Sequence, residues 1–167
     1  MDTFFEQIVK IKANGKYFLS IAAIWILALA LCVLVFPLLG TFSVIACFGI
    51  IYLAYRLSSQ LNIEYEYIIT NGVLDIDKII NKSSRKRELS LSLDKTTRIE
   101  KFNFNLISNV DKQKKVIACD EKDPNAYLLV CEREGKGTYY LVFAPDEKMK
   151  SAIVKFVPKF IANSAFK

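Results

Sequence analysis

The chain has 167 residues, of which 53% are hydrophobic and 24% are charged, and its formal net charge is +6. This length predicts one domain plus whatever structure a concentrated apolar segment forms. The absence of histidine removes the usual general base near neutral pH and every catalytic triad that contains one. The four cysteines, at positions 32, 47, 119 and 131, form no C-x-x-C pair, so we expect buried reduced thiols, and neither a zinc site nor a disulfide framework.

Residues 1–16 are predicted to be a cytoplasmic N-terminal segment. The apolar residues of TFFEQIVKIK, residues 3–12, recur near helical spacing, and the following Asn14-Gly15 is typical of a helix stop. The pattern predicts either a short interfacial helix on the membrane surface or a frayed terminus.

A long apolar segment follows. Residues 18–55 contain no Asp, Glu, Lys or Arg. A spanning helix needs about 20 apolar residues, so this run is too long for one helix and long enough for two short ones. Pro37 and Gly40 are the strong helix breakers near its middle. We therefore predict a transmembrane helical hairpin in residues 17–57, with helices at about 17–36 and 40–56.

Other structures for the apolar segment remain open. A cleaved signal peptide would explain the basic residues that precede the run, but the run is too long for one and no small-residue cleavage site follows it. One long tilted helix, or a re-entrant segment, would also place the run in a membrane.

The cations that flank the apolar segment predict its orientation. Lys10, Lys12 and Lys16 precede the first helix, Arg56 ends the second, and the connecting turn carries no charge. Basic residues are enriched on the cytoplasmic side of membrane proteins. We therefore expect a multi-pass protein of the cell membrane with both termini in the cytoplasm.

After Leu57 the apolar period changes to two, which predicts a cytoplasmic β-domain in residues 58–167. Turn signals separate seven predicted strands, at about 62–70, 73–80, 86–93, 97–104, 114–119, 127–133 and 138–143. An amphipathic helix follows at about 146–162, and Pro158 is expected to kink or end it near Val157. The predicted fold class is an α+β membrane protein, with a transmembrane helical hairpin followed by a seven-stranded antiparallel β-barrel or sandwich that the C-terminal helix plugs.

The order of seven strands and one terminal helix is that of the pleckstrin-homology (PH) superfold. YEYIITNGVLDIDKI at 65–79 and RKRELSLSLDKTTRIE at 85–100 resemble the start of bacterial PH-like domains. The layout of the whole chain resembles a family of small bacterial membrane proteins in which a transmembrane hairpin precedes such a domain. The resemblance implies a membrane-tethered scaffold or binding domain and no known reaction.

One departure from PH domains that bind phosphoinositides concerns the connection between the first two strands. Those domains generally use a long basic loop there, whereas the predicted connection in this chain is the two-residue turn Asn71-Gly72. The resemblance therefore implies no headgroup pocket.

The hairpin that turns at Asn71-Gly72 is predicted to have one apolar face and one acidic face. The acidic side chains are Glu64, Glu66, Asp75 and Asp77. They form either a docking face for a cationic partner or a weak cation site, or they are neutralised by the basic residues 85–87 of the next strand. A hydrolytic carboxylate pair would require a cleft and separated pKa values, which an open hairpin face does not offer.

The next turn is basic. The candidate lipid or partner contacts are Lys78, Lys82, Arg85, Lys86 and Arg87. They predict either attraction to anionic headgroups, about 1 kcal/mol per cation near the surface, or a solvated loop that compensates the acidic face. No basic and aromatic pattern typical of a nucleic-acid-binding module occurs, so no nucleic acid is expected as a partner.

No phosphate-binding loop, nucleophile elbow or metal-ligand spacing occurs in the sequence. We therefore expect a module without catalytic activity, metal or cofactor, anchored in the lipid bilayer, that binds or scaffolds an unknown protein partner or forms a homo-oligomer. The alternative is a peripheral sensor of anionic lipid that uses the basic loop 82–87.

Overall fold

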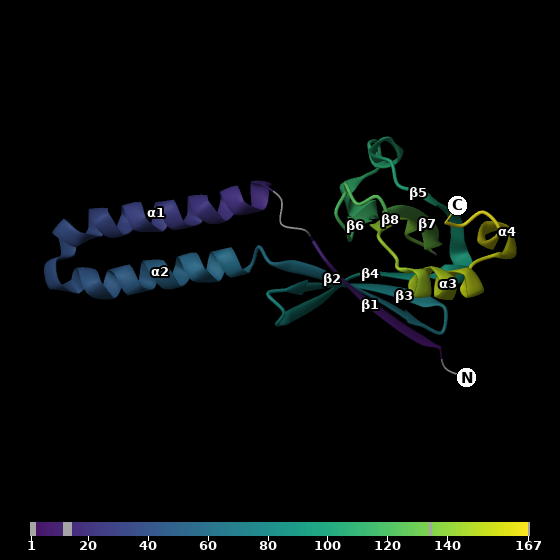
Figure 1. Ribbon diagram of the computed structural model, residues 1–167, viewed down its shortest axis with the longest axis horizontal. Helices are drawn as coiled ribbons and strands as arrows, with labels where there is room; N and C mark the ends of the chain where they lie inside the picture. Colours follow the sequence, from purple (N-terminus) through teal and green to yellow (C-terminus); the bar gives the residue numbers. More distant parts are fainter. Residues whose placement is uncertain (1–2, 12–14, 134, 167) are drawn as a thin grey trace. The chain divides into compact units, whose positions relative to one another are not determined.

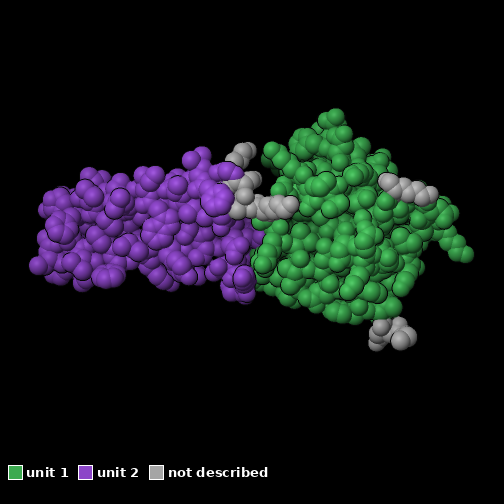
Figure 2. Space-filling model, viewed as in Figure 1, with its two compact units in different colours: residues 1–11, 64–79, 84–167 green, residues 12–63, 80–83 purple. Residues whose placement is uncertain are grey.

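The computed structural model describes residues 3–11, 15–133 and 135–166. The chain divides into two compact units (Figure 2). The helical unit comprises residues 12–63 and 80–83, and the β-domain comprises residues 1–11, 64–79 and 84–167.

The helical unit contains helix α1 (Gly15–Leu39) and helix α2 (Ser43–Ser59), which lie side by side (Figure 1). The 3-10 turn Gly40–Phe42 joins them. Pro37 was expected to end the first helix, but it lies inside α1, and the chain turns at Gly40, whose φ of +52° is a conformation that glycine adopts most readily. Helix α1 therefore extends a few residues beyond both of its predicted ends, whereas α2 begins and ends a few residues later than predicted.

Residues Phe4–Lys10 form a β-strand, β1, so the interfacial helix predicted for the N-terminal segment is wrong. Strand β1 pairs antiparallel with strand β2 (Ile63–Thr70) from Phe4 opposite Thr70 to Lys10 opposite Glu64. Tertiary pairing decided the structure of a short segment whose apolar spacing suited a helix. Asn14 of the predicted helix stop lies outside the described residues.

The first sheet has the strand order β1-β2-β3-β4, with β3 at Val73–Ile80 and β4 at Ser84–Ser92. The tight turn between β2 and β3 has positive φ at both Asn71 and Gly72, as a type I′ turn requires. A Cβ added to Gly72 would lie 3.1 Å from the Phe156 ring, so helix packing also demands glycine there.

The second sheet has the strand order β5-β7-β8-β6. Its strands are β5 (Thr96–Lys101), β6 (Lys115–Ile117), β7 (Tyr127–Arg133) and β8 (Gly137–Phe143). Strands β5, β7 and β8 are antiparallel neighbours, whereas β6 pairs parallel to β8. The described residues thus form eight strands in two four-stranded sheets, in place of the seven antiparallel strands that we predicted.

The added strand changes which segment connects the first two strands. Those strands are β1 and β2, so the helical unit lies between them in the chain, and Asn71-Gly72 connects the second strand to the third. The prediction that a two-residue turn joins the first two strands is therefore wrong.

Side chains of both sheets and of the C-terminal helix form one core. The predicted apolar face of the hairpin belongs to this core, in which Tyr67, Ile69, Leu74 and Ile76 are fully buried. Helix α3 (Glu147–Phe156) adds its own apolar face, which is Met149, Ala152 and Ile153. Helix α3 ends before Pro158, as expected, and the short helix α4 (Lys159–Ala162) follows.

The second sheet is buried on both faces. Leu128, Val130 and Val142 face a smaller cluster that includes Ile107 and Ala126. The irregular segment that contributes Ile107 contains the 3-10 helices Phe104–Ile107 and Lys112–Lys114, and a third one, Leu93–Lys95, precedes β5. The unbroken apolar run YLLVC in β7 is typical of a strand covered on two sides.

Candidate functional site

The predicted acidic residues lie on neighbouring strands of the first sheet, but they are not an open face. Glu64, Glu66 and Asp77 are buried, with Glu66 only 1% exposed, and Asp75 is partly buried. Burial of carboxylates is costly unless cations compensate them.

Two arginines of β4 supply that compensation. Arg85 Nη2 lies 2.9 Å from Glu66 Oε1, and Arg87 Nη1 lies 2.6 Å from Asp75 Oδ2. Arg87 also pairs with Asp77, and Lys10 Nζ on β1 lies 3.9 Å from Glu64 Oε1. The structure thus shows neutralisation by the neighbouring strand, which was the alternative to a docking face.

Glu66 is the least compensated member of this group. Its Oε2 is buried and has no hydrogen-bond donor among the described residues. The Glu6 carboxyl on β1 lies within hydrogen-bonding reach of the Glu66 carboxyl. Burial, contact with Glu6 and the charge of Asp77 raise the pKa of Glu66, and Arg85 lowers it less than these raise it. Protonation of one of the two carboxyl groups would remove the repulsion between them and supply a hydrogen-bond donor.

The predicted basic residues do not act as one group. Arg85 and Arg87 are engaged by the buried carboxylates. Lys82 and Lys86 are exposed, Lys78 is partly exposed, and no ion pair joins these three lysines to the described part of the chain. Of the five predicted basic residues, those that no carboxylate of the described residues engages are therefore the three lysines.

Strand β1 is a candidate surface that the sequence pattern did not reveal. It is one of the two edge strands of the first sheet, and an edge strand presents backbone donors and acceptors that no neighbouring strand occupies. Phe4 and Ile8 on its outer face are 61% and 51% exposed. The run FFEQIVK, rich in aromatic and β-branched residues, was the signal for a strand.

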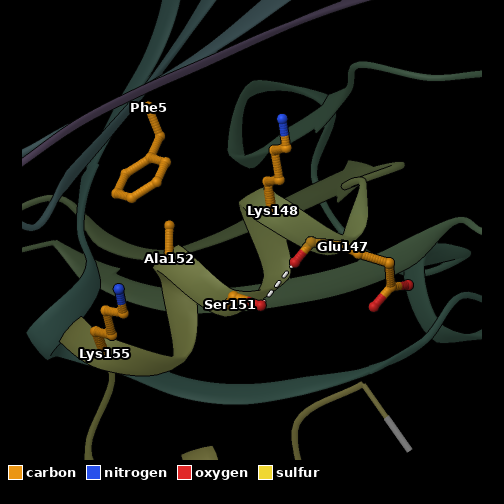
Figure 3. A pocket seen from close by; sticks show the side chains of 6 residues that line it. All are labelled: Phe5, Glu147, Lys148, Ser151, Ala152 and Lys155. Atoms are coloured by element: carbon orange, nitrogen blue, oxygen red, sulfur yellow. Dashed lines mark hydrogen bonds between the residues drawn. The ribbon is translucent and has the colours of Figure 1, made fainter.

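A groove lies between the inner face of β1 and helix α3 (Figure 3). Its volume is about 340 Å³, and its lining residues are Phe5, Glu147, Lys148, Ser151, Ala152 and Lys155. The Lys155 ammonium lies 5.7 Å from the centre of the Phe5 ring. The groove therefore has apolar side chains from both elements and two lysines on its α3 side.

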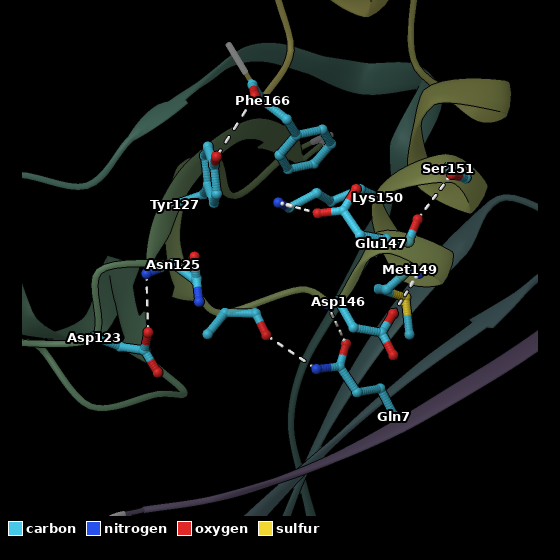
Figure 4. Close-up of polar contacts among 11 residues, drawn as sticks. Gln7, Asp123, Asn125, Tyr127, Asp146, Glu147, Met149, Lys150, Ser151 and Phe166 are labelled. Atoms are coloured by element: carbon cyan, nitrogen blue, oxygen red, sulfur yellow. Dashed lines mark hydrogen bonds and ion pairs between the residues drawn. The ribbon is translucent and has the colours of Figure 1, made fainter.

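Strand β1 is fastened to the start of α3 by one side chain, as Figure 4 shows. Gln7 Nε2 donates to the Ala144 carbonyl over 3.0 Å, and the Asp146 N–H donates to Gln7 Oε1 over 2.9 Å. Asp146 in turn caps α3 by accepting from the Met149 N–H over 2.7 Å. These bonds fix the distance between the two walls of the groove.

Glu147 is the acidic residue of the groove lining, and it is already paired. Its Oε1 lies 2.9 Å from Lys150 Nζ, on the side of α3 that faces Tyr127 and Phe166 (Figure 4). Pairing with Glu147 raises the pKa of Lys150, against the opposing effect of burial. The charges of the groove that remain unpaired among the described residues are Lys148 and Lys155.

No cluster of metal-ligating side chains occurs within residues 3–11, 15–133 and 135–166. All four cysteines are free, and burial raises the pKa of Cys119 to about 12 and that of Cys131 to about 11. These two thiols stay protonated near neutral pH and are poor nucleophiles.

The family model described as "Bacterial PH-like domain (DUF6106)" matches residues 1–163. No curated protein and no solved structure matches the chain significantly. The matched range begins before β1 and includes both apolar helices and the β-domain, so the family describes the two units together.

Proposed function

Because the chain belongs to the bacterial PH-like domain family, we propose that it is a membrane-anchored cytoplasmic module that binds or scaffolds a protein partner. A PH-like domain suggests binding or scaffolding without catalysis. The observation that carries the proposal is the pairing of β1 with β2, one strand from each side of the apolar segment.

The surface of the helical unit supports the membrane anchor. Tyr17–Ser59 is long and apolar enough to cross a membrane by length and composition. Its exposed side chains include Leu19, Ile26, Leu38, Ile45 and Phe48. At 1.5 Å per residue, 25 residues of α1 measure about 37 Å and 17 residues of α2 about 25 Å, which brackets a hydrocarbon thickness of about 30 Å.

The strand pairing supports two crossings. Hydrogen-bonded strands of one sheet lie on one side of a membrane, so the segment between β1 and β2 crosses an even number of times. A cleaved signal peptide would remove β1 from the sheet, and a single tilted span would separate β1 from β2. Arg56 at the end of α2 supports a cytoplasmic location for both ends. Lys12 lies outside the described residues, and the side chain of Lys16 is not described.

The proposal is tested with the full chain in its native cells. We expect the protein to stay in the membrane pellet after extraction with alkaline carbonate. Photo-cross-linking residues placed singly over the β-domain should capture a discrete protein at one face, which is either a different protein or a second copy. Release of the chain by carbonate, or the absence of protein cross-links from every face, would overturn the proposal.

The alternative function, sensing of anionic lipid, is favoured by Lys82 and Lys86 of the basic turn, which form no ion pair with the described residues. Its test is hydrogen exchange of the full chain in nanodiscs with and without anionic lipid. Protection of the amides of residues 82–87 only with anionic lipid, lost in Lys82→Gln/Lys86→Gln, would support this function. Identical exchange in both membranes would exclude it.

A further inference from the structure

We propose that an acidic, extended segment of a partner protein adds to the free edge of β1 and lies in the groove between β1 and α3. This inference rests on the proposed function and names the binding surface and the chemistry of the partner. It starts from strand β1, which has β2 on one side and no strand on the other side among the described residues.

The position of the groove fits a strand added to this edge. Side chains alternate between the two faces of a sheet, so every second side chain of an added strand points to the same side as Phe5, Gln7 and Val9. Phe5 lines the groove from β1, and Ala152 lines it from α3 (Figure 3). The inward side chains of an added strand therefore enter the groove, and the outward ones lie beside exposed Phe4 and Ile8.

The charge of the groove selects the inward side chains. Lys148 and Lys155 are two turns apart on α3, about 10 Å, with Ser151 between them. Successive inward residues of a strand are about 6.7 Å apart. The first and third of three such residues are therefore about 13 Å apart, and two flexible lysine side chains can reach both of them. The matching segment has two carboxylates at inward positions on either side of an apolar residue that packs on Phe5.

The same charges argue against a second copy of this chain as the occupant. Antiparallel pairing of two β1 strands would bring Phe5, Gln7 and Val9 to the inward positions. None of them is acidic, so a second copy offers Lys148 and Lys155 no counterion. A partner with carboxylates at those positions fits better.

The probe is a synthetic seven-residue peptide with valine at its centre, glutamate two positions to either side and threonine elsewhere. Binding is measured with the full chain in detergent. We expect this peptide to bind at least tenfold more tightly than versions with glutamine or lysine in place of glutamate. The variant Lys148→Glu/Lys155→Glu should lose affinity for the glutamate peptide and gain affinity for the lysine peptide. The control variant Lys112→Glu/Lys136→Glu changes two exposed lysines outside the groove and should keep the original preference.

Backbone methylation tests the strand geometry independently of charge. Alternate amides of an added strand point to β1 and the others point away from it. Two series of the glutamate peptide are compared, one N-methylated at the glutamate and valine residues and one N-methylated at the threonine residues. We expect one series to lose binding and the other to keep it. Equal effects of both series, no binding of the glutamate peptide, or binding unaffected by the charge reversal would each overturn the inference.

Cross-linking in cells separates this inference from the proposed function. Capture of a protein from Phe4 and Ile8, and not from Lys82 or Lys86, would support both. Capture at another face alone would overturn the inference and leave the proposed function standing. Capture of a second copy through β1, abolished by Ile8→Lys and unaffected by Lys148→Glu, would overturn the partner that we propose.

Discussion

Tyr67 of β2 holds two segments of the second sheet at one buried point. Its hydroxyl donates to the Ala118 carbonyl over 2.7 Å and accepts from the Ala144 N–H over 3.3 Å. Its ring packs edge-on against Phe143, with 5.8 Å between ring centres. The side chain is fully buried, so neither backbone group has water as a substitute partner.

Tyr67→Phe should therefore destabilise the β-domain by about 1–3 kcal/mol, because it leaves two buried backbone groups without a partner and changes little else. Urea unfolding of the full chain in detergent, followed by near-UV circular dichroism, measures this. The matched control is Tyr140→Phe, because the hydroxyl of Tyr140 makes no hydrogen bond to the described residues. Equal stability of the two variants would contradict the role assigned to Tyr67.

Glu66 should give the β-domain a pH dependence of defined sign. Because the pKa of Glu66 in the folded protein is raised, the folded state binds its proton more tightly than the unfolded state does. The stability that this residue contributes is complete below the unfolded carboxyl pKa of about 4.3 and is lost as the pH rises through the higher folded value. Glu66→Gln mimics the protonated form.

The free energy of unfolding of the wild type minus that of Glu66→Gln should therefore fall as the pH rises from about 4.3 toward neutrality. Taking the difference cancels the titration of the carboxylates that do not interact with Glu66, and urea titrations at several pH values supply it. A difference that stays constant or rises with pH would mean that the Glu66 carboxyl is fully ionised by its contact with Arg85.

At the scale of elements, most of the β-domain follows from local patterns. The strands between residues 62 and 143 and the helix break before Pro158 follow from period-two alternation, turn residues and proline chemistry. Strand β1 does not follow from them, because seven residues with apolar pairs suit a helix face as well as a strand, and the paired positions, from Phe4 with Thr70 to Lys10 with Glu64, are far apart in the chain. The groove between β1 and α3 could not be predicted without β1.

The burial of the acidic hairpin face was also beyond local patterns. Alternation placed Glu64, Glu66, Asp75 and Asp77 on one face, but their burial depends on Arg85 and Arg87 of β4 and on β1. Opposite charges in the next strand indicated the compensation, and only the tertiary structure reveals the contact of Glu6 with Glu66.

The register of β1 on β2 gives a direct prediction for this element. Phe4→Cys/Thr70→Cys, introduced into a chain whose native cysteines are replaced by alanine, should form a disulfide when membranes are oxidised, because the two positions lie directly opposite each other. Phe4→Cys/Ile69→Cys is the control, since neighbouring residues of a strand point to opposite faces. Cross-linking of the control alone would mean that β1 is shifted by one residue.

At the scale of the whole molecule, the β-domain is assembled from both sides of the apolar segment. Strand β1 precedes the helices in the chain, and the remaining seven strands follow them. The sheet can close only after the helices and β2 have been made, and it forms only if both ends of the apolar segment lie on one side of the membrane. The strand order therefore links the β-domain to segments on both sides of the apolar helices, in agreement with the family match over residues 1–163.

The most direct test of this account is thiol labelling with a membrane-impermeant reagent in intact and lysed cells. Single cysteines replace Thr3 before α1, Thr41 in the turn between the helices, or Lys136 between β7 and β8, in the same cysteine-free background. The account predicts that intact cells label only Thr41→Cys and that lysed cells label all three variants. Labelling of Thr3→Cys and Lys136→Cys from opposite sides of the membrane would contradict it.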